Sequence, residues 1–332
     1  MSERTGAIDV HAHFIPPAYV ELTRRVGAGD GETAAEARLT YEHPLRVRDP
    51  MFGGELGSRV ELMDGAGIAT QILSFSSPNV WHRDVAMRAA LVRTFNEGCL
   101  EACRAFPGRF KLFANVPMPF VEAALEETSR VGDDPDVVGF GICTHAGDLA
   151  LDDRRFEPVY AEWDRRRAAV LVHPDRFSTP KVLERYGMEW GLGAPFDDTI
   201  AVVRLVRGGV AARYPRITWI VPHLGGTLPI LYERLDLLGR RAGPGGTPLP
   251  PLRDGLAAFL FDTCTPSRSG LRLAREVLGA DRLVFGSDFP YVSRDDLGAG
   301  LRLLEEAGFG REELASARGR TMLARIPTLA GA

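Results

Sequence analysis

The sequence predicts one (β/α)₈ barrel domain spanning all 332 residues, and two observations lead to it. Short apolar, β-branched runs alternate with amphipathic stretches along the whole chain, as in a parallel sheet covered by helices. Eight such runs fit into a chain of this length, and 45% hydrophobic residues are enough for a large core. The predicted strands are residues 7–12, 68–74, 110–116, 137–143, 168–172, 217–222, 258–262 and 282–286.

The segments between these runs have the periodicity of amphipathic helices. Residues 84–106 place apolar side chains on one stripe, and residues 197–214 do the same. The main rival is a doubly wound open sheet, but no G-x-G-x-x-G follows the first strand and no Walker-type loop is present. The barrel is therefore the predicted fold class.

Two connections are too long to be plain turns. Residues 14–59 form an insertion after the first strand, and residues 174–197 form a lid segment after the fifth. In a barrel both would emerge at the carboxyl ends of the strands, where active sites lie. Residues 243–251, rich in Gly and Pro, are expected to form a flexible excursion.

Charge and hydropathy exclude several classes of partner. A net charge of −4 argues against the clustered positive surface that nucleic acid requires. No stretch reaches the 18 or so apolar residues of a membrane span, and the N-terminus leads directly into the first strand, so we expect a cytoplasmic protein without a membrane partner. The four cysteines contain no C-x-x-C pair and are expected to be free thiols.

Five polar residues lie at or just after the ends of predicted strands, around the expected mouth of the barrel. Because side chains alternate along a strand, His11 and His13 should point to the same side. His173, His223 and Asp288 each follow a later apolar run, so all five should converge at one rim. Three histidines and one carboxylate suit zinc or a similar ion. The residues alone do not separate the ligands from a catalytic acid or base.

The motifs around these residues resemble those of the amidohydrolase superfamily. They are His11-x-His13, His173-Pro174, His223-Leu224-Gly225-Gly226 and Gly286-Ser287-Asp288-Phe289-Pro290, and the similarity runs from Ile8 to about Tyr291. More narrowly, the chain resembles the aminocarboxymuconate-semialdehyde decarboxylase family, which includes decarboxylases of salicylate-like acids such as 6-methylsalicylate. The resemblance implies that His11, His13, His173 and Asp288 bind the metal and that His223 stands beside it as an acid/base residue.

The expected number of metal ions is one. Superfamily members with two ions bridge them by a carboxylated lysine at the end of strand four, where this chain has Cys143-Thr144-His145 and its lysines are Lys111 and Lys181. Zinc is expected, with manganese as the other candidate. His145 is either a second hydrogen-bonding group near the site or a plain loop histidine.

The resemblance also implies substrate-binding residues. Arg46 matches an arginine that binds a substrate carboxylate, and Arg234 matches one that reaches the neighbouring subunit's site, which implies a homodimer. Trp190 and Phe289 are expected to stack on a flat substrate. Asp175 departs from the pattern of the semialdehyde decarboxylases, which have an aromatic residue there, so a salicylate-type ring is at least as well supported as a muconate substrate. Arg48, Arg59 and Arg176 are interpreted as solvated surface residues.

The predicted activity is non-oxidative decarboxylation of an unsaturated or aromatic carboxylic acid, a carbon–carbon lyase reaction without an organic cofactor. The metal would chelate the small carboxylic acid, and Asp288 or His223 would protonate the carbon that loses CO₂. Attack by hydroxide on the ring remains an alternative scheme. The competing function is hydrolysis or hydration of a lactone, an amide or a C=C bond at the same metal. A catalytically dead binding protein is the third alternative, disfavoured because unpaired histidines in a barrel mouth are costly.

Overall fold

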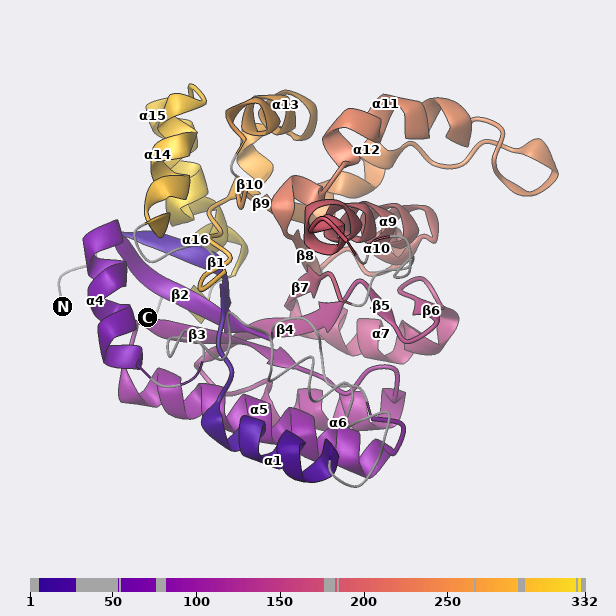
Figure 1. Ribbon diagram of the computed structural model, residues 1–332. Helices are drawn as coiled ribbons and strands as arrows, with labels where there is room; N and C mark the ends of the chain where they lie inside the picture. The colour runs from indigo at the N-terminus through magenta and orange to yellow at the C-terminus, as the bar shows by residue number, and fades with distance from the viewer. Residues whose placement is uncertain are drawn as a thin grey trace.

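Eight parallel strands form one sheet in the order β1-β2-β3-β4-β7-β8-β9-β10 (Figure 1). The computed structural model describes residues 6–27, 53, 55–75, 82–175, 183, 185–265, 267–291, 296–326 and 328–329. All eight predicted strands are confirmed. They are β1 Ala7–His13, β2 Ile68–Ser74, β3 Phe110–Asn115, β4 Val137–Cys143, β7 Ala169–His173, β8 Thr218–Val221, β9 Phe259–Asp262 and β10 Leu283–Val284.

Backbone hydrogen bonds join the two ends of this sheet. The amide of Val10 donates to the carbonyl of Phe285 at 3.0 Å, and the amide of Asp288 donates to the carbonyl of His11 at 2.8 Å. The amide of His13 donates to Phe289 at 2.7 Å. Because the segment after β10 thus pairs with β1, the carboxyl ends of all eight strands surround one mouth, as in a (β/α)₈ barrel.

Strand β1 contains one extra residue near the mouth. Asp9 pairs with Gln71 and Ala12 pairs with Leu73, so three steps along β1 match two along β2. Such a bulge reverses the alternation of side chains beyond it. Ile8 and Val10 face the barrel interior by ordinary alternation, and because of the bulge His11, the next residue, also turns toward the mouth.

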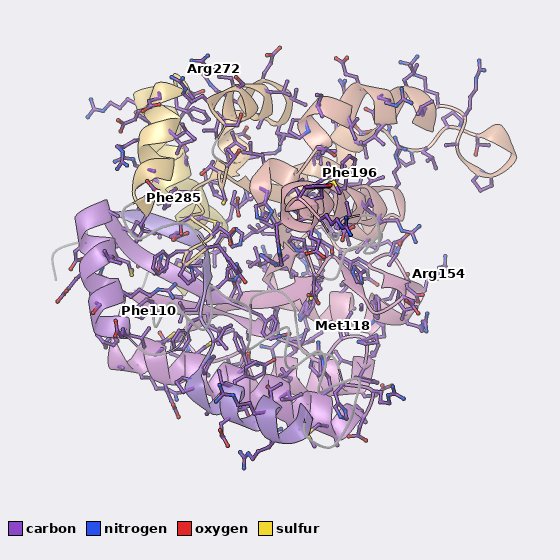
Figure 2. All side chains as sticks on the ribbon, in the orientation of Figure 1. Phe110, Met118, Arg154, Phe196, Arg272 and Phe285 are labelled. Atoms are coloured by element: carbon purple, nitrogen blue, oxygen red, sulfur yellow. The ribbon has the colours of Figure 1, made fainter. Side chains whose placement is uncertain are left out.

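Each of the eight strands contributes apolar side chains to the barrel interior. Residues near the C-terminus, on and after α16 (Thr321–Arg325), pack against this interior cluster. A larger cluster fills the space between the strands and the outer helices. In Figure 2 the buried Phe110 and Phe285 lie inside, whereas the exposed Arg154 and Arg272 lie at the periphery. The interior members are Ile8, Val10, Ile72, Phe113, Val138, Ala169, Leu171, Ile220, Leu260, Val284, Met322, Ile326 and Leu329.

Helices follow most strands and cover the outer face of the sheet (Figure 1). A short hairpin, β5 (His145–Ala146) and β6 (Leu149–Ala150), follows β4. The helix predicted over 84–106 is confirmed as α5 (Val85–Ala105), whose first turn is capped by Asp84. The other helices are α1 Pro17–Gly27, α4 Leu56–Ala66, α6 Val121–Val131, α7 Glu157–Arg166, α9 Ala194–Arg207, α10 Val210–Arg213, α11 Leu228–Gly239, α12 Leu252–Gly255, α13 Arg268–Leu278, α14 Ala299–Glu306 and α15 Arg311–Ala315.

One predicted helix is divided in the structure. Residues 197–214 belong to α9, which begins earlier at Ala194, and to α10. Gly209 lies between them with φ of +75°, a left-handed conformation that glycine adopts without steric cost. A helix cannot continue through that conformation, so the apolar stripe is shared by two helices.

The long connections are described in part. After β1, helix α1 packs on α5, where the rings of Tyr19 and Phe95 lie 5.7 Å apart. Residues 28–52, which include Arg46 and Arg48, lie outside the described residues, and so does Arg176. The described end of the lid segment contains a π-helical turn over Glu189–Gly193 that leads into α9.

The interpretation of Arg59 as a solvated residue is wrong. Its side chain is fully buried, its Nε donates to Gln71 Oε1 at 2.8 Å and its Nη1 donates to the carbonyl of His13 at 2.7 Å. Its guanidinium also lies over the Phe289 ring, 4.9 Å from the centroid. Arg59 is therefore a structural support beneath the end of β1.

Within the described parts of the chain, no helix has both the length and the apolar character needed to cross a membrane.

Candidate active site

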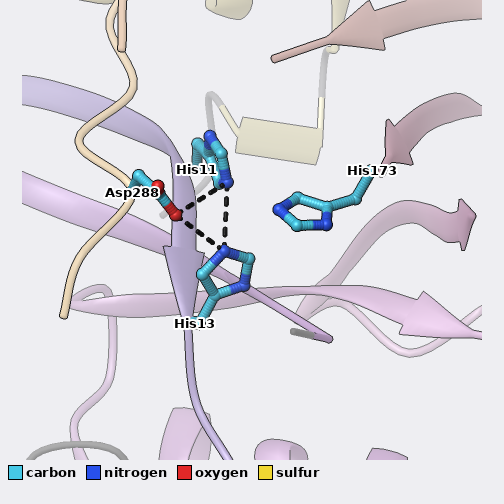
Figure 3. Close-up of side chains that lie close together, drawn as sticks. All are labelled: His11, His13, His173 and Asp288. Atoms are coloured by element: carbon cyan, nitrogen blue, oxygen red, sulfur yellow. Dashed lines mark hydrogen bonds and ion pairs between the residues drawn. The ribbon is translucent and has the colours of Figure 1, made fainter. Parts of the chain in front are cut away.

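Four side chains meet at the mouth of the barrel with metal-ligating atoms that all lie within 4.8 Å of one another (Figure 3). They are His11, His13, His173 and Asp288. The Nε2 atoms of His11 and His13 are 3.0 Å apart, and Asp288 Oδ1 lies 3.3 Å and 3.0 Å from them. Ligands about 2.1 Å from one small divalent ion have similar separations.

The fold brings these residues together from three places in the chain. His11 and His13 end β1, His173 ends β7, and Asp288 follows β10, which the backbone hydrogen bonds place beside β1. All three histidines are buried, whereas the Asp288 side chain is 21% exposed and faces the mouth. The predicted convergence of distant strand ends is present in the structure.

Each of the three histidines has its Nδ1 occupied by a second group. His11 Nδ1 lies 2.7 Å from Asp262 Oδ2, and His173 Nδ1 lies 2.9 Å from the carbonyl of Pro174. His13 Nδ1 lies 3.2 Å from Ser74 Oγ, whose own hydrogen is directed to the carbonyl of Ala12. These partners accept hydrogen bonds, so each Nδ1 carries the proton and each Nε2 keeps a lone pair.

These lone pairs make the site suitable for a cation. Two imidazole lone pairs 3.0 Å apart and a carboxylate oxygen repel one another unless a positive charge lies among them. Burial lowers the pKa of His11, but the charges of Asp288 and Asp262 outweigh it and raise that pKa above its usual value. The donor set, three imidazoles and one carboxylate, fits a single divalent transition metal ion.

His223 lies beside this group but is held differently. Its ring centroid is 5.4 Å from that of His11, and its Nε2 is 3.8 Å from Asp288 Oδ2. Its Nδ1 lies 2.9 Å from Asp198 Oδ2, and the Asp198 carboxyl is fully buried at the start of α9. Burial lowers the pKa of His223, yet the charge and hydrogen bond of Asp198 raise it well above its usual value. A histidine held in this way can keep a proton at Nε2 and deliver it.

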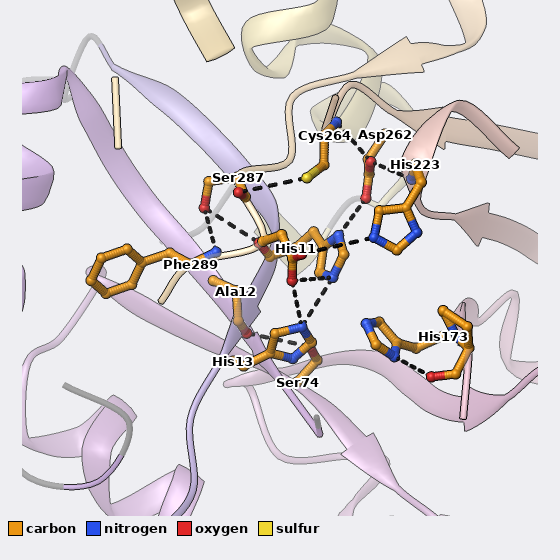
Figure 4. A network of polar contacts seen from close by, with 12 residues as sticks. His11, Ala12, His13, Ser74, His173, His223, Asp262, Cys264, Ser287 and Phe289 are labelled. Atoms are coloured by element: carbon orange, nitrogen blue, oxygen red, sulfur yellow. Dashed lines mark hydrogen bonds and ion pairs between the residues drawn. The ribbon is translucent and has the colours of Figure 1, made fainter. Parts of the chain in front are cut away.

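Asp262 connects the metal-ligating group to His223 (Figure 4). While its Oδ2 accepts from His11, its Oδ1 accepts from the backbone amides of His223 and Cys264, each at 2.9 Å. Asp262 is the last residue of β9 and is fully buried. One carboxylate thus orients His11 and fixes the backbone position of His223.

A second buried carboxylate, that of Asp9, supports the backbone on both sides of the site. Its Oδ1 accepts from the amides of His11 at 3.2 Å and Ser287 at 2.9 Å, and its Oδ2 accepts from Ser287 Oγ at 2.6 Å. Gln71 also donates to Oδ2 at 2.8 Å and links Asp9 to Arg59. Asp9 therefore ties β1 to the turn that carries Asp288.

Three non-glycine residues at the site have left-handed backbone conformations. His223, Leu224 and Asp288 have φ values of +52°, +60° and +60°. Such conformations are costly for residues with a side chain and persist only where the surrounding contacts impose them. Because two of these residues are His223 and Asp288, the strained backbone sets the direction of both side chains at a cost in folding free energy.

The residues expected to bind substrate have different surroundings. The ring of Trp190, partly exposed, lies roughly parallel to that of Tyr291 with centroids 6.3 Å apart, and Tyr291 in turn contacts His13 edge to face at 5.6 Å. Phe289 is fully buried against Arg59 and turns away from the histidines (Figure 4), so its placement does not favour a substrate contact. Arg234 is exposed on α11. His145 lies in the β5–β6 hairpin, with Nδ1 2.8 Å from the carbonyl of Gly147.

Several functional candidates were missed by sequence reasoning. Asp262, Asp198, Asp9, Ser74 and Tyr291 all contact site residues. The available signals were weak: Asp262 is a carboxylate at the end of an apolar run, Asp9 precedes the His-x-His pair, and Asp198 starts an amphipathic helix. Each pattern is equally typical of solvated strand ends and helix starts.

Comparisons with known proteins agree with this geometry. A family model described as amidohydrolase matches residues 8–317. The 6-methylsalicylic acid decarboxylase of Penicillium expansum is 30% identical over 297 residues, 87% of this chain and 86% of that protein. The gamma-resorcylate decarboxylase of Rhizobium sp. (strain MTP-10005) is 27% identical over 87% of this chain and 89% of its own length.

A solved structure extends the likeness to the fold. The 5-carboxyvanillate decarboxylase of Novosphingobium aromaticivorans DSM 12444, complexed with manganese and 4-hydroxy-3-methoxy-5-nitrobenzoic acid, matches with a TM-score of 0.82. The two chains are 20% identical, and the match covers 98% of this chain and 97% of the other.

Proposed function

The chain belongs to the amidohydrolase family, and on that basis we propose that it is a metal-dependent carboxy-lyase that removes CO₂ from a small aromatic carboxylic acid. One observation carries this proposal. His11, His13 and His173 each use Nδ1 for a hydrogen bond to a neighbouring group, and this leaves their Nε2 lone pairs available beside Asp288. A salicylate-type ring is the proposed substrate, in line with the relatives' names.

His11, His13, His173 and Asp288 would hold one divalent ion. Bound there, the ion would act as a Lewis acid toward the substrate's carboxylate and neighbouring oxygen. Three imidazole ligands favour zinc. Manganese is the alternative, because the solved structure of the 5-carboxyvanillate decarboxylase contains that ion. Metal analysis of the purified protein decides between them.

The chemical problem of decarboxylation is the electron pair of the breaking C–C bond. Direct loss of CO₂ would leave that pair in the plane of the ring, where the π system cannot delocalise it. Protonation of the ring carbon that bears the carboxylate removes this problem, because the bonding pair then returns to the π system as CO₂ departs. One proton is consumed and one CO₂ is released.

His223 is the residue we assign to this proton transfer. Asp198 orients its ring and stabilises its charged form, so Nε2 can donate to the ring carbon. The distance of 3.8 Å between His223 Nε2 and Asp288 Oδ2 supports this assignment, because it brings the proposed donor near the proposed metal site. The second carboxylate oxygen of Asp288 would orient the proton that His223 donates.

Residues 14–59 and 174–197 are the proposed walls of the substrate site in this single-domain barrel. Trp190 supports this assignment, because its ring lies against Tyr291, which contacts His13. In this arrangement Trp190 and Tyr291 would cover one face of a flat substrate. Arg46 remains the proposed partner of the substrate carboxylate.

We also propose that two copies of the chain associate through the α11 region. Arg234 and three exposed apolar side chains, Ile230, Leu237 and Leu238, belong to this one helix. Exposed apolar side chains gathered on one element favour contact with another protein surface. In such a dimer Arg234 would reach the neighbouring site.

Release of CO₂ from a panel of hydroxybenzoates tests the proposed activity, with ring-opening of lactones measured in parallel. The proposal predicts CO₂ release from at least one salicylate-type acid and no lactone hydrolysis. Lactone turnover without CO₂ release would assign the site to the hydrolases instead.

A further inference from the structure

A pocket opens beside His173 at the carboxyl ends of four neighbouring strands. Ser74 ends β2, Asn115 ends β3, Cys143 ends β4 and His173 ends β7. Because His173 also belongs to the metal-ligating group, a substrate held there would extend into this pocket. The described residues that line it are Ser74, Phe75, Asn115, Gly141, Ile142, Cys143, Leu171, His173, Pro174 and Asp175.

Asn115 contributes an amide oxygen whose hydrogen-bonding capacity is unused. Its backbone amide donates to Asn96 Oδ1 at 2.8 Å, and its carbonyl accepts from Asn96 Nδ2 at 2.9 Å. These two bonds fix the end of β3, and the residue is 2% exposed. Among the described residues, nothing donates to Asn115 Oδ1. A buried acceptor without a donor is unfavourable, so a ligand that supplies one gains binding free energy.

Asp175 contributes a carboxyl group to the same pocket. The residue is only 7% exposed, and the thiol of Cys143 donates to its Oδ2 at 3.6 Å. A thiol is a weak donor, and a carboxyl group has several lone pairs, so further hydrogen bonds can be accepted here. Phe75, Ile142 and Leu171 make much of the remaining lining apolar.

We propose that Asn115 and Asp175 select a substrate whose ring carries an additional O–H or N–H donor besides its carboxylate and adjacent hydroxyl. The proposal rests on the decarboxylase function proposed above and specifies its substrate. The apolar lining accommodates the flat ring, while the two acceptors bind the donor on its edge. A methyl group at that position would leave Asn115 Oδ1 buried without a donor. A second carboxylate there would bring its acceptor oxygens against Asn115 Oδ1 and the Asp175 carboxyl group, and neither contact could form a hydrogen bond.

Matched pairs of salicylates test this selectivity. At each free ring position the hydroxyl, amino and methyl derivatives are compared by kcat/KM for CO₂ release. At one position we expect the hydroxyl or amino compound to exceed the methyl compound by about tenfold or more, since a hydrogen bond to a charged or buried acceptor is lost with methyl. The dissociation constants of the same pairs are measured by calorimetry on His223→Ala, which the proposed chemistry leaves able to bind.

Two leucine variants remove the acceptors, and two further variants serve as controls. Asp175→Leu and Asn115→Leu should each abolish most of the preference, whereas Asp175→Asn keeps an acceptor oxygen and should retain it. Thr144→Val removes a buried hydroxyl that also lacks a partner in the described structure but lies outside the pocket lining, so the preference should not change. If one leucine variant does not fold, the other still gives the test.

The outcomes separate this inference from the proposed function. CO₂ release with hydroxyl and methyl compounds within twofold of each other at every position overturns the inference and leaves the function intact. A preference that survives in both folded leucine variants also overturns it. Binding that favours the donor compounds, without CO₂ release from any of them, supports the pocket's selectivity and contradicts the decarboxylase proposal.

Discussion

His11 Nδ1 lies 2.7 Å from Asp262 Oδ2, and both side chains are fully buried. This contact orients the ring of His11 so that Nε2 faces His13 and Asp288. The other oxygen of Asp262 accepts from the amide of His223. The proposed metal ligand and the proposed proton donor therefore depend on one carboxylate.

Asp262→Ala should weaken metal binding without removing a ligand. Loss of the hydrogen bond lets the His11 ring rotate and lowers its basicity, and loss of such a partner typically costs about 10- to 100-fold in affinity. Metal affinity measured by competition with a chelator checks this. Asp262→Asn, which keeps an acceptor, should lose less, and unchanged affinity in the alanine variant would contradict the role.

His173→Ala and His223→Ala should separate metal binding from proton transfer. Removing His173 takes away a proposed ligand, so metal content and turnover should fall together. Removing His223 should leave the metal in place and reduce kcat by roughly 10²- to 10⁴-fold. Elemental analysis and CO₂ release on both variants give the comparison. A His223→Ala enzyme with an undiminished rate would refute the assignment of the proton donor.

The pH dependence of kcat/KM should reflect the ionisation of the Asp198 carboxyl group. Burial raises the pKa of this carboxyl from 3.8 to about 6, although the charge of His223 and its hydrogen bond lower it. Above that pH the ionised carboxylate accepts the Nδ1 proton of His223, and below it the protonated carboxyl no longer stabilises charged His223. We therefore expect kcat/KM to fall as the pH drops through about 6.

Asp198→Asn should remove this limb of the profile, provided that metal content is held constant. The amide cannot titrate, so the acidic decline with its midpoint near the Asp198 pKa should be absent while the overall rate is lower. An unchanged acidic limb in the variant would show that another group controls it.

Arg59→Met should destabilise the fold strongly. The change leaves Gln71 Oε1 and the carbonyl of His13 without their buried donor, at a cost of about 2–4 kcal/mol in the free energy of unfolding. Urea denaturation measures it. Arg25→Ala is the control, because Arg25 is 69% exposed and 3.8 Å from Glu21, and it should change stability by less than about 0.5 kcal/mol. Equal effects would contradict a supporting role for Arg59.

Arg234→Ala should raise KM if its guanidinium reaches the substrate site of a second copy. Sedimentation analysis of the variant shows whether the dimer persists, and steady-state kinetics gives KM and kcat. An unchanged KM in a stable dimer would remove Arg234 from the substrate site.

The sequence predicted the eight strands because their apolar runs are separated by clear helical stretches. Since parallel strands have their carboxyl ends at one rim, the convergence of His11, His13, His173, His223 and Asp288 could also be predicted. Local sequence patterns do not predict features that depend on strand register or on burial by residues distant in the chain.

The bulge in β1 shows one such limit. The simple alternation predicted that His11 and His13 share a side, which is correct, but it gave no sign that His11 turns toward the mouth directly after Val10, which faces the barrel interior. The burial of Arg59 shows another: an arginine among many appears solvated until tertiary structure supplies its partners. Asp198 and Asp262 escaped notice for the same reason, because only the fold brings His223 and His11 to them.

Reconstitution of the chelated protein tests the central claim most directly. The protein is stripped of metal, titrated with zinc or manganese, and assayed for CO₂ release from a salicylate-type acid after each addition. The account predicts no turnover without metal and full recovery at one ion per chain. Full activity after exhaustive chelation would contradict it.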